Sequence, residues 1–284
     1  MSAAPGADML REILAEEKHW WLFYLATILF FMLVVEVGYR FGRRRRNKAD
    51  PEQKSQTGTV LASLLALLGF LLAISFGIAA DRFGERKALV LEEANAVSTA
   101  FLRADFLDAP QRMAVQRLLR EYAQMRVEYV RRGDLGEVEE GLARSEEAHR
   151  ELWALARAAA GERPRSVPVG LFVDSLNEVI DLHEERVTVG LRHRIPPSLL
   201  WTLYLVAFLS MGTMGIHFGL SGTRNGTTTV ALVVAFAAVL LLIVDLDQPT
   251  QRLFDVSQEP LADTVQIMDD ALEYEPPRGG GPAE

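Results

Sequence analysis

Four long apolar segments, almost free of ionisable side chains, constrain this chain more than any other feature of its sequence. They cover roughly residues 20–39, 60–80, 198–220 and 226–244, and their only acidic, basic or histidine side chains are Glu36 and His217. About 20 consecutive apolar residues are enough to cross the ~30 Å of hydrocarbon in a bilayer. Runs of this kind are rare in soluble folds, so the sequence predicts four transmembrane helices rather than four buried helices of a soluble protein.

The spacing of these spans divides the chain into parts. The fold class we predict is all-α: a polytopic membrane protein with four transmembrane helices and a helical bundle inserted between helices two and three. The C-terminal tail is expected to be partly disordered, because it ends in the Pro- and Gly-rich stretch EPPRGGGPAE. The expected parts are an N-terminal segment (1–19), helices one and two (20–80) with a basic loop (40–58), the extramembrane domain (81–195), helices three and four (196–247) and the tail (248–284).

The inserted domain reads as helical, because its apolar residues recur at spacings of 3, 4 and 7. Asp108 and Ser166 each precede a proline that suits a first helical turn. Pro196-Pro197 would then end the last helix of the domain at the membrane boundary. We infer about four helices, two of them continuous or nearly so with spans two and three. The apolar stripes lie within residues 89–101, 115–129, 135–155 and 169–191.

Composition removes several function classes. The net charge of −8 argues against nucleic acid, which needs a clustered basic face. The chain has no cysteine, which excludes disulfides, thiolate metal sites and cysteine nucleophiles. No HExxH, GxSxG or phosphate-binding loop occurs, and Ser210 and His217 lie two helical turns apart, too far for a nucleophile and its base. We therefore expect no enzyme and no catalytic residue.

One short segment leaves a metal site open. His183 has Asp181 and Glu184 as close neighbours in the sequence. Acidic residues on neighbouring helical turns more often form a solvated face, so we expect neither a metal nor a cofactor.

The connection between the first two spans is strongly basic. Short connections rich in Lys and Arg stay in the cytoplasm, which predicts a multi-pass inner-membrane protein with the loop 40–58 cytoplasmic and the helical domain outside. The same cluster would also suit an anchor for anionic lipids, an alternative that agrees with this orientation. The basic residues are Arg40, Arg43, Arg44, Arg45, Arg46, Lys48 and Lys54.

Residues at helical spacing define two distinct faces on the second span. Small residues recur along one of them from Ala62 to Ala80, and such residues let helices approach closely in lipid. The other face is the candidate pore lining: Phe70 and Ile74 would form a constriction, and Asp81 would ring its mouth. Alternatively, the small residues pack and the others fill the bundle. The candidate pore-lining residues are Ser63, Phe70, Ile74, Gly77 and Asp81.

Charged residues gather where the membrane should meet the domain. Span four ends in LLIVDLDQP, which places Asp245 at the hydrocarbon edge and Asp247 just beyond it. Charges at that depth are costly unless they are paired or hydrated. We therefore expect an interfacial charged collar, formed by Arg82, Glu85, Arg86, Arg192, Arg194, Asp245 and Asp247.

Span three presents a polar face made of Ser210, Thr213 and His217. These side chains could line a wet path through the membrane. Such residues more often hydrogen-bond a neighbouring helix, so both interpretations stay open.

Several segments resemble the bacterial bestrophin-like membrane proteins, a domain-of-unknown-function family also found in plants. The resemblance covers most of the chain and leaves the first 50 residues and the Gly-rich tail unmatched. The matching motifs are specific for membership in this family but poorly specific for an activity. They are LLGFLLAISFGIAADRFGERKALVLEEANAVSTAFLRAD (67–105), LNEVIDLHEERV (176–187), RIPP (194–197), VDLDQP (244–249) and VSQEPLAD (256–263).

The resemblance implies kinship with bestrophins, which are pentameric anion channels with four spans per subunit and a pore lined by span two. By position, Phe70, Ile74 and Gly77 fall in that pore segment. Two features depart from the bestrophin pattern. Bestrophin necks hold several closely spaced aromatic residues, whereas span two has only Phe70 and Phe76, and bestrophins keep the inter-span domain in the cytoplasm.

Two functions follow as hypotheses. The first is a homo-oligomeric ion channel in the lipid bilayer, with span two facing the axis and an inorganic anion as the permeant species. The second is a non-conducting membrane scaffold or sensor that acts through its helical domain.

Overall fold

Every element in the described part of the chain is a helix, which confirms the all-α class. The computed structural model describes residues 20–132, 135–192, 194–222, 226–248 and 256–273. They form two compact units, and each is described by itself. The membrane unit comprises the described residues up to Arg82 and residues 194–248, and the helical domain comprises residues 83–192 and 256–273.

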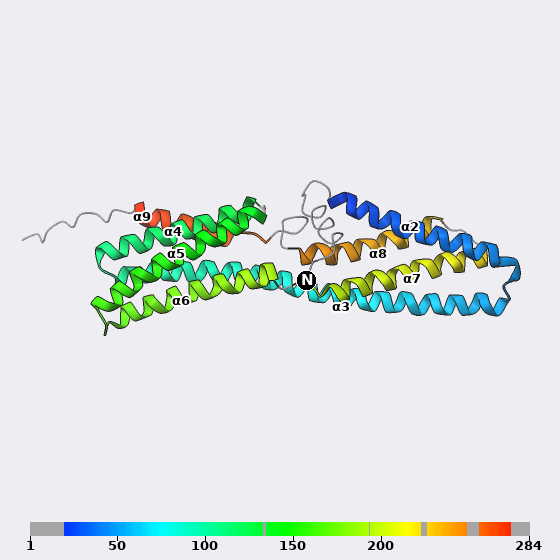
Figure 1. Ribbon diagram of the computed structural model, residues 1–284, viewed down its shortest axis with the longest axis horizontal. Helices are drawn as coiled ribbons and strands as arrows, with labels where there is room; N and C mark the ends of the chain where they lie inside the picture. The colour runs from blue at the N-terminus through cyan, green and yellow to red at the C-terminus, as the bar shows by residue number, and fades with distance from the viewer. Residues whose placement is uncertain (1–19, 133–134, 193, 223–225, 249–255, 274–284) are drawn as a thin grey trace, which may run out of the picture. The chain divides into compact units, whose positions relative to one another are not determined.

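The membrane unit holds the four predicted spans (Figure 1), each on a helix long and apolar enough to cross a bilayer. The basic loop predicted over residues 40–58 is wrong in its extent, because most of it is helical. Arginines at the end of a helix interact favourably with its dipole, and proline suits a first turn. The helices are α2 (Trp20–Arg45), η1 (Arg46–Lys48), the first part of α3 (Pro51–Arg103), α7 (Pro197–Ser221) and α8 (Gly226–Asp247).

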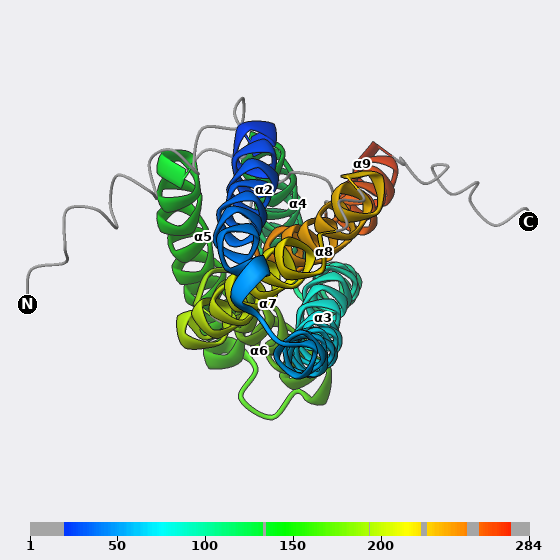
Figure 2. The ribbon, with the colours of Figure 1, turned by 90° about the vertical axis from the view of Figure 1, so that its right-hand side faces the viewer.

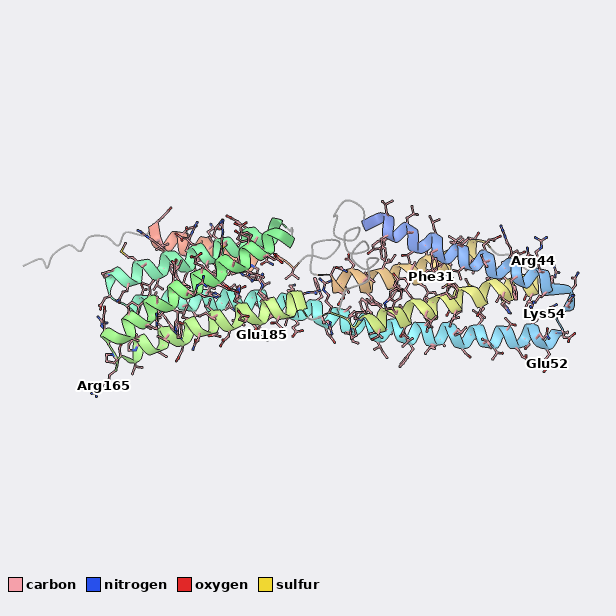
Figure 3. All side chains as sticks on the ribbon, in the orientation of Figure 1. Phe31, Arg44, Glu52, Lys54, Arg165 and Glu185 are labelled. Atoms are coloured by element: carbon pink, nitrogen blue, oxygen red, sulfur yellow. The ribbon has the colours of Figure 1, made fainter. Side chains whose placement is uncertain are left out.

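Helices α2 and α7 cross at close range, because glycines face the opposite backbone. A Cβ atom at Gly42 would overlap the carbonyl of Ile216, and one at Gly219 would overlap the carbonyl of Tyr39. Away from the glycines, aromatic rings fill the contact: Phe31, labelled in Figure 3, lies 6.4 Å from the ring of Tyr204. Close backbone approach through small residues is a main source of helix association in lipid.

We expect Gly42→Ala to destabilise the membrane unit by about 1–3 kcal/mol, the usual cost of overpacking. The added methyl group meets backbone atoms of α7, which cannot rotate away as a side chain would. Thermal unfolding in detergent measures the loss. Gly226→Ala is the matched control, since nothing lies within 4 Å of its Cβ position; equal melting temperatures for both variants would contradict the close crossing.

The helical domain is a bundle built from the second part of α3 and four further helices (Figures 1 and 2). Its core is apolar and continuous, with Val97, Leu119, Leu152 and Leu176 fully buried. The elements after α3 are η2 (Ala104–Phe106), α4 (Ala109–Arg132), α5 (Leu135–Glu162), α6 (Val167–Val187), the π-helix η3 (Thr188–Arg192) and α9 (Glu259–Glu273).

Helix α9 lies in the segment that the sequence assigned to a partly disordered tail. It packs against α4 and buries Leu261, Val265 and Met268 in the core of the domain. The bidentate pair between Arg120 and Asp269, with donor–acceptor distances of 2.7 and 2.9 Å, holds it there. This part of the tail therefore belongs to the helical domain; the stretch EPPRGGGPAE lies outside the described residues.

The predicted helix boundaries were mostly correct. The hydroxyl of Ser166 accepts a hydrogen bond from the N–H of Val169 at 3.4 Å, which confirms it as an N-cap. The side chain of Asp108 instead pairs with Arg163 across the domain. α3 runs through both units without interruption, whereas α6 and η3 end before α7 begins at Pro197.

Candidate functional site

The candidate pore face of α3 is exposed in the isolated protomer. Phe70 is 62% and Ile74 45% exposed, and Ser63 and Asp81 are exposed as well. Nothing lies within 4 Å of the Cβ position of Gly77. The four exposed side chains and the open Cβ position of Gly77 therefore lie on one face, which is not covered by the described part of the chain.

The opposite face of the same helix makes the contacts within the protomer. Leu68, Leu72, Ser75 and Ala79 are all buried and recur at spacings of 4, 3 and 4. At 3.6 residues per turn, their mean direction lies about 150° around the helix from Phe70 and Ile74. α3 thus packs through one face and presents the candidate pore face outward.

The stripe of small residues on α3 is also uncovered. Ala62, Ala66, Gly69 and Ala73 are exposed, and a Cβ atom at Gly69 would meet nothing within 4 Å. The stripe therefore does not pack inside the protomer, unlike the glycines between α2 and α7. It is free for a contact with another molecule.

Two of the predicted collar residues of the membrane unit, Arg82 and Asp247, lie close together. Oδ1 of Asp247 accepts the N–H of Ile195 at 2.8 Å and lies 4.0 Å from Nη1 of Arg82. Asp245 is buried two residues earlier, and Arg194 is exposed. Asp247 therefore links the end of α8 to the segment before α7 and to α3.

The other predicted collar residues belong to the helical domain. Glu85 is exposed and Arg86 is buried, while the side chain of Arg192 lies outside the described ones. A single collar that joins both sets stays a prediction.

The predicted polar face of α7 is not one continuous wet surface. Ser210 is buried, and its hydroxyl donates to the carbonyl of Val206 on the same helix at 2.7 Å. Thr213 is half-buried. The ring of His217 lies against α3 at Gly58, where a Cβ atom would come within 3.1 Å of it. Ser210 thus satisfies its own helix, and His217 packs at the start of α3.

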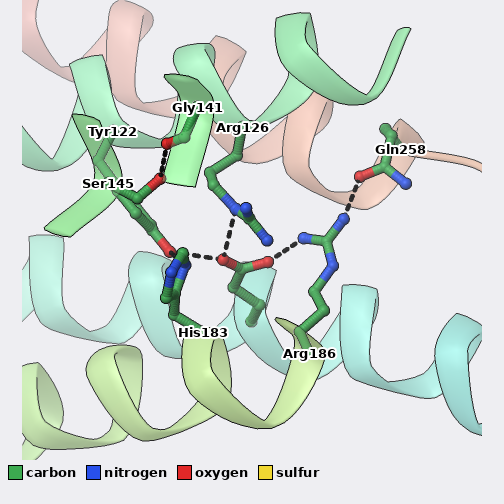
Figure 4. A network of polar contacts seen from close by, with 8 residues as sticks. Tyr122, Arg126, Gly141, Ser145, His183, Arg186 and Gln258 are labelled. Atoms are coloured by element: carbon green, nitrogen blue, oxygen red, sulfur yellow. Dashed lines mark hydrogen bonds and ion pairs between the residues drawn. The ribbon is translucent and has the colours of Figure 1, made fainter. Parts of the chain in front are cut away.

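A buried charge network that the sequence did not predict occupies the core of the helical domain (Figure 4). Its centre is the carboxylate of Glu93 on α3, whose residue is 0% exposed. Oε1 accepts from the hydroxyl of Tyr122 at 2.6 Å and from Nε of Arg126 at 3.1 Å, both on α4. Oε2 accepts from Arg186 on α6, which also donates to Gln258 just before α9. One carboxylate thus ties together α3, α4 and α6, and Arg186 connects it to the segment before α9.

The electrostatics of this network keep Glu93 ionised. Burial alone would raise the pKa of this carboxyl. The guanidinium groups of Arg126 and Arg186, together with the Tyr122 hydroxyl, outweigh burial and lower the pKa from 4.5 to about 2. Burial and the neighbouring carboxylate raise the pKa of Tyr122 well above 10, so its proton stays in the hydrogen bond to Glu93.

Two histidines complete the network, and both are held neutral. The ring of His149 on α5 lies 4.8 Å from that of His183 and 5.0 Å from that of Tyr122. Burial, followed by the charge of Arg126, lowers the pKa of His149 to about 4 and that of His183 to about 3. Tyr122 gives its only proton to Glu93, so Nδ1 of His183, 3.2 Å away, must carry a hydrogen and donate to the phenol oxygen.

The chemistry of this network is structural. It combines one carboxylate with two guanidinium groups and two neutral imidazoles. The net positive charge of these groups disfavours the binding of a metal cation. Within the described residues no group of three His, Asp or Glu is placed to hold a metal ion. The metal site considered at His183 does not form there, because that side chain is buried while Asp181 and Glu184 are exposed.

The sequence does contain a signal for the network. Glu93 lies four residues after Leu89 and four before Val97, on the apolar stripe of its helix. Arg126 and His183 occupy the same kind of position, four residues after Tyr122 and Val179. Charged or polar residues inside apolar stripes on several helices of one bundle indicate that they meet in its core.

Comparison with known proteins gives one family and a shared fold. The sequence matches the Bestrophin-like domain over residues 25–261. A crystal structure of a membrane protein is similar to 88% of this chain and 99% of its own, with a TM-score of 0.65 and 14% identity. A bacterial bestrophin homologue from Klebsiella pneumoniae, crystallised with a point mutation, is similar over 88% and 98%, with a TM-score of 0.56 and 17% identity. No curated protein matches.

Proposed function

Because this chain belongs to the Bestrophin-like family, as a multi-pass integral membrane protein, we propose that it forms a homo-oligomeric ion channel lined by α3. The pathway runs along the face of Ser63, Phe70, Ile74, Gly77 and Asp81. The observation that carries the proposal is the exposure of this face: large apolar side chains lie outward on a helix that packs through its opposite side. Bulky apolar residues at such a position form constrictions that gate by dewetting.

The oligomer would form through the small-residue stripe on α3. Ala62, Ala66, Gly69 and Ala73 lie beside the pore face and are uncovered in the protomer. Small residues permit close helix contacts in lipid. A neighbouring subunit packed on this stripe would place Phe70 and Ile74 next to a common axis.

An inorganic anion is the permeant species we propose on the basis of the family. Asp81 lies at the end of the pore face and is exposed. A ring of carboxylates favours cations, so Asp81 would oppose the anion flow that the family suggests rather than assist it. The reversal potential under a chloride gradient decides the permeant ion.

Replacing Phe70 with alanine tests the lining. We expect Phe70→Ala to raise the ion flux of reconstituted protein several-fold, because it widens the apolar constriction. Phe76→Ala is the matched control: the same side chain is removed from the same helix, at a 40% exposed position about 120° away. Chloride efflux from chloride-loaded vesicles measures both, and equal effects of the two variants would contradict a pathway along the Phe70 face.

The orientation is part of the proposal. The basic residues at the end of α2 favour the cytoplasmic side under the positive-inside rule, which places the helical domain outside. Protease accessibility of the helical domain in sealed vesicles of known orientation tests this assignment.

A non-conducting scaffold or sensor is the second candidate, and a groove on the helical domain favours it. The groove lies on α4 and α5 and has a volume of about 380 Å³. Its lining contains both acidic and basic side chains, which suits a polar partner. A well-formed oligomer that carries no current would favour this candidate. The lining residues are Arg120, Glu121, Gln124, Met125, Glu128, Tyr129, Glu140 and Arg144.

A further inference from the structure

The outer face of α2 carries an exposed apolar stripe that ends in arginine. Leu29, Leu33, Val37 and Phe41 are all exposed and follow one another at spacings of four. The next residue in this series is Arg45, whose guanidinium lies 4.5 Å from the centre of the Phe41 ring. At 3.6 residues per turn, each step of four residues turns the direction by about 40°, so the stripe winds obliquely around α2 and Arg45 continues the same ridge.

The dimensions of this face fit one leaflet of a bilayer. From Leu29 to Phe41 the helix rises about 18 Å at 1.5 Å per residue. Half of the hydrocarbon thickness of a bilayer is about 15 Å. An acyl chain lying along the stripe would thus bring its headgroup to the level of Arg45.

The basic residues around this end of α2 have different surroundings. Arg40 pairs with Glu36 on its own helix, with 2.8 Å between Nε and Oε1. The guanidinium of Arg46 lies against Gly222, where α7 ends. Arg44 and Arg45 are exposed, and no carboxylate in the described part of the chain forms an ion pair with either. These two arginines retain their capacity for an external anion.

We propose that Arg44 and Arg45 bind the phosphate of an anionic phospholipid whose acyl chain lies on the stripe from Leu29 to Phe41. Lys54, near the start of α3, lies at the same end of the membrane unit (Figure 3) and adds positive charge there. Arginine binds phosphate with two parallel hydrogen bonds, and its aliphatic part can lie along apolar surface. The adjoining apolar stripe distinguishes a lipid from a soluble polyanion. This inference does not depend on ion conduction.

Lipid selectivity tests the proposal. The protein is placed in nanodiscs of equimolar phosphatidylglycerol and phosphatidylcholine, and the lipids that remain bound are counted by native mass spectrometry. We expect the wild-type protein to retain phosphatidylglycerol preferentially. The double variant Arg44→Gln/Arg45→Gln should lose about thirtyfold in this preference, since each of the two basic residues near a membrane surface contributes on the order of 1 kcal/mol.

Two further variants separate the lipid site from charge in general. Arg117→Gln/Arg150→Gln removes the same charge from exposed positions of the helical domain and should keep the wild-type preference. Arg44→Lys/Arg45→Lys keeps the charge, and hence the topology signal. This variant should retain most of the preference for phosphatidylglycerol. A wild-type protein without headgroup preference would overturn the proposal. So would full retention of phosphatidylglycerol by Arg44→Gln/Arg45→Gln, or an equal loss in the Arg117→Gln/Arg150→Gln control.

Discussion

Replacing Glu93 with glutamine is expected to lower the free energy of unfolding of the helical domain by about 3–5 kcal/mol, the usual cost of breaking a buried ion pair from one side. Glutamine keeps the size of the side chain but removes its charge. Arg126 and Arg186 would then remain in the core as two cations without their carboxylate. Urea unfolding of the full-length protein in detergent measures the loss of stability. Hydrogen exchange then measures the protection of the backbone amides in α4, α5 and α6.

The adjacent residue supplies the control for this experiment. Glu92→Gln makes the same chemical change at an exposed position of the same helix, where substitutions usually stay within about 0.5 kcal/mol. If Glu93→Gln and Glu92→Gln unfold at the same urea concentration, the network does not hold the domain together.

Acidification is expected to destabilise the helical domain by about 4 kcal/mol between pH 7 and pH 5. The pKa values of His149 and His183, about 4 and about 3, lie below the ordinary 6.5, so the unfolded chain binds protons first. Their contribution to stability is complete above about pH 6.5 and is lost as the pH falls toward 4 for His149 and toward 3 for His183. Each histidine loses about 2 kcal/mol over this interval, at 1.36 kcal/mol per proton and pH unit. The pKa of Glu93, lowered to about 2, affects stability only below about pH 4.5.

The variant His149→Phe separates the two histidines. Nε2 of His149 makes no hydrogen bond within the described residues, so phenylalanine removes the titration without leaving a partner unsatisfied. We expect about half of the pH dependence to remain, with stability at pH 7 close to that of the wild type. Glu147→Gln, an exposed change on the same helix, should leave the pH dependence intact. An unchanged pH profile in His149→Phe would show that His149 is not buried in its neutral form.

The membrane part of the fold could be predicted from the sequence because its rule is simple. A segment in hydrocarbon must be long and apolar, and all four spans follow that rule. Helix starts marked by proline and serine, such as Ser166, could also be predicted. Helix α9 was missed although Leu261, Val265 and Met268 recur at helical spacings of 4 and 3; the structure was needed to show that this face packs against α4.

The site was predictable only in part, for a physical reason. The α3 face of Phe70 and Ile74 follows from helical periodicity alone, and periodicity within one helix can be read directly. The partners of Glu93 are Tyr122, Arg126 and Arg186, which lie 29, 33 and 93 positions further along the chain. Pairings between such distant residues can be assigned only from the tertiary structure. The sequence shows only that each of these residues interrupts an apolar stripe.

Cysteine accessibility tests the proposed pathway along α3 most directly, because the chain has no cysteine of its own. Ile74→Cys and Phe76→Cys would each be reconstituted in planar bilayers and exposed to an anionic thiol reagent during recording. We predict that the reagent blocks the current of Ile74→Cys and leaves that of Phe76→Cys unchanged. A current that the reagent affects equally in both variants, or an intact oligomer that passes no current at all, would contradict an ion pathway lined by this face.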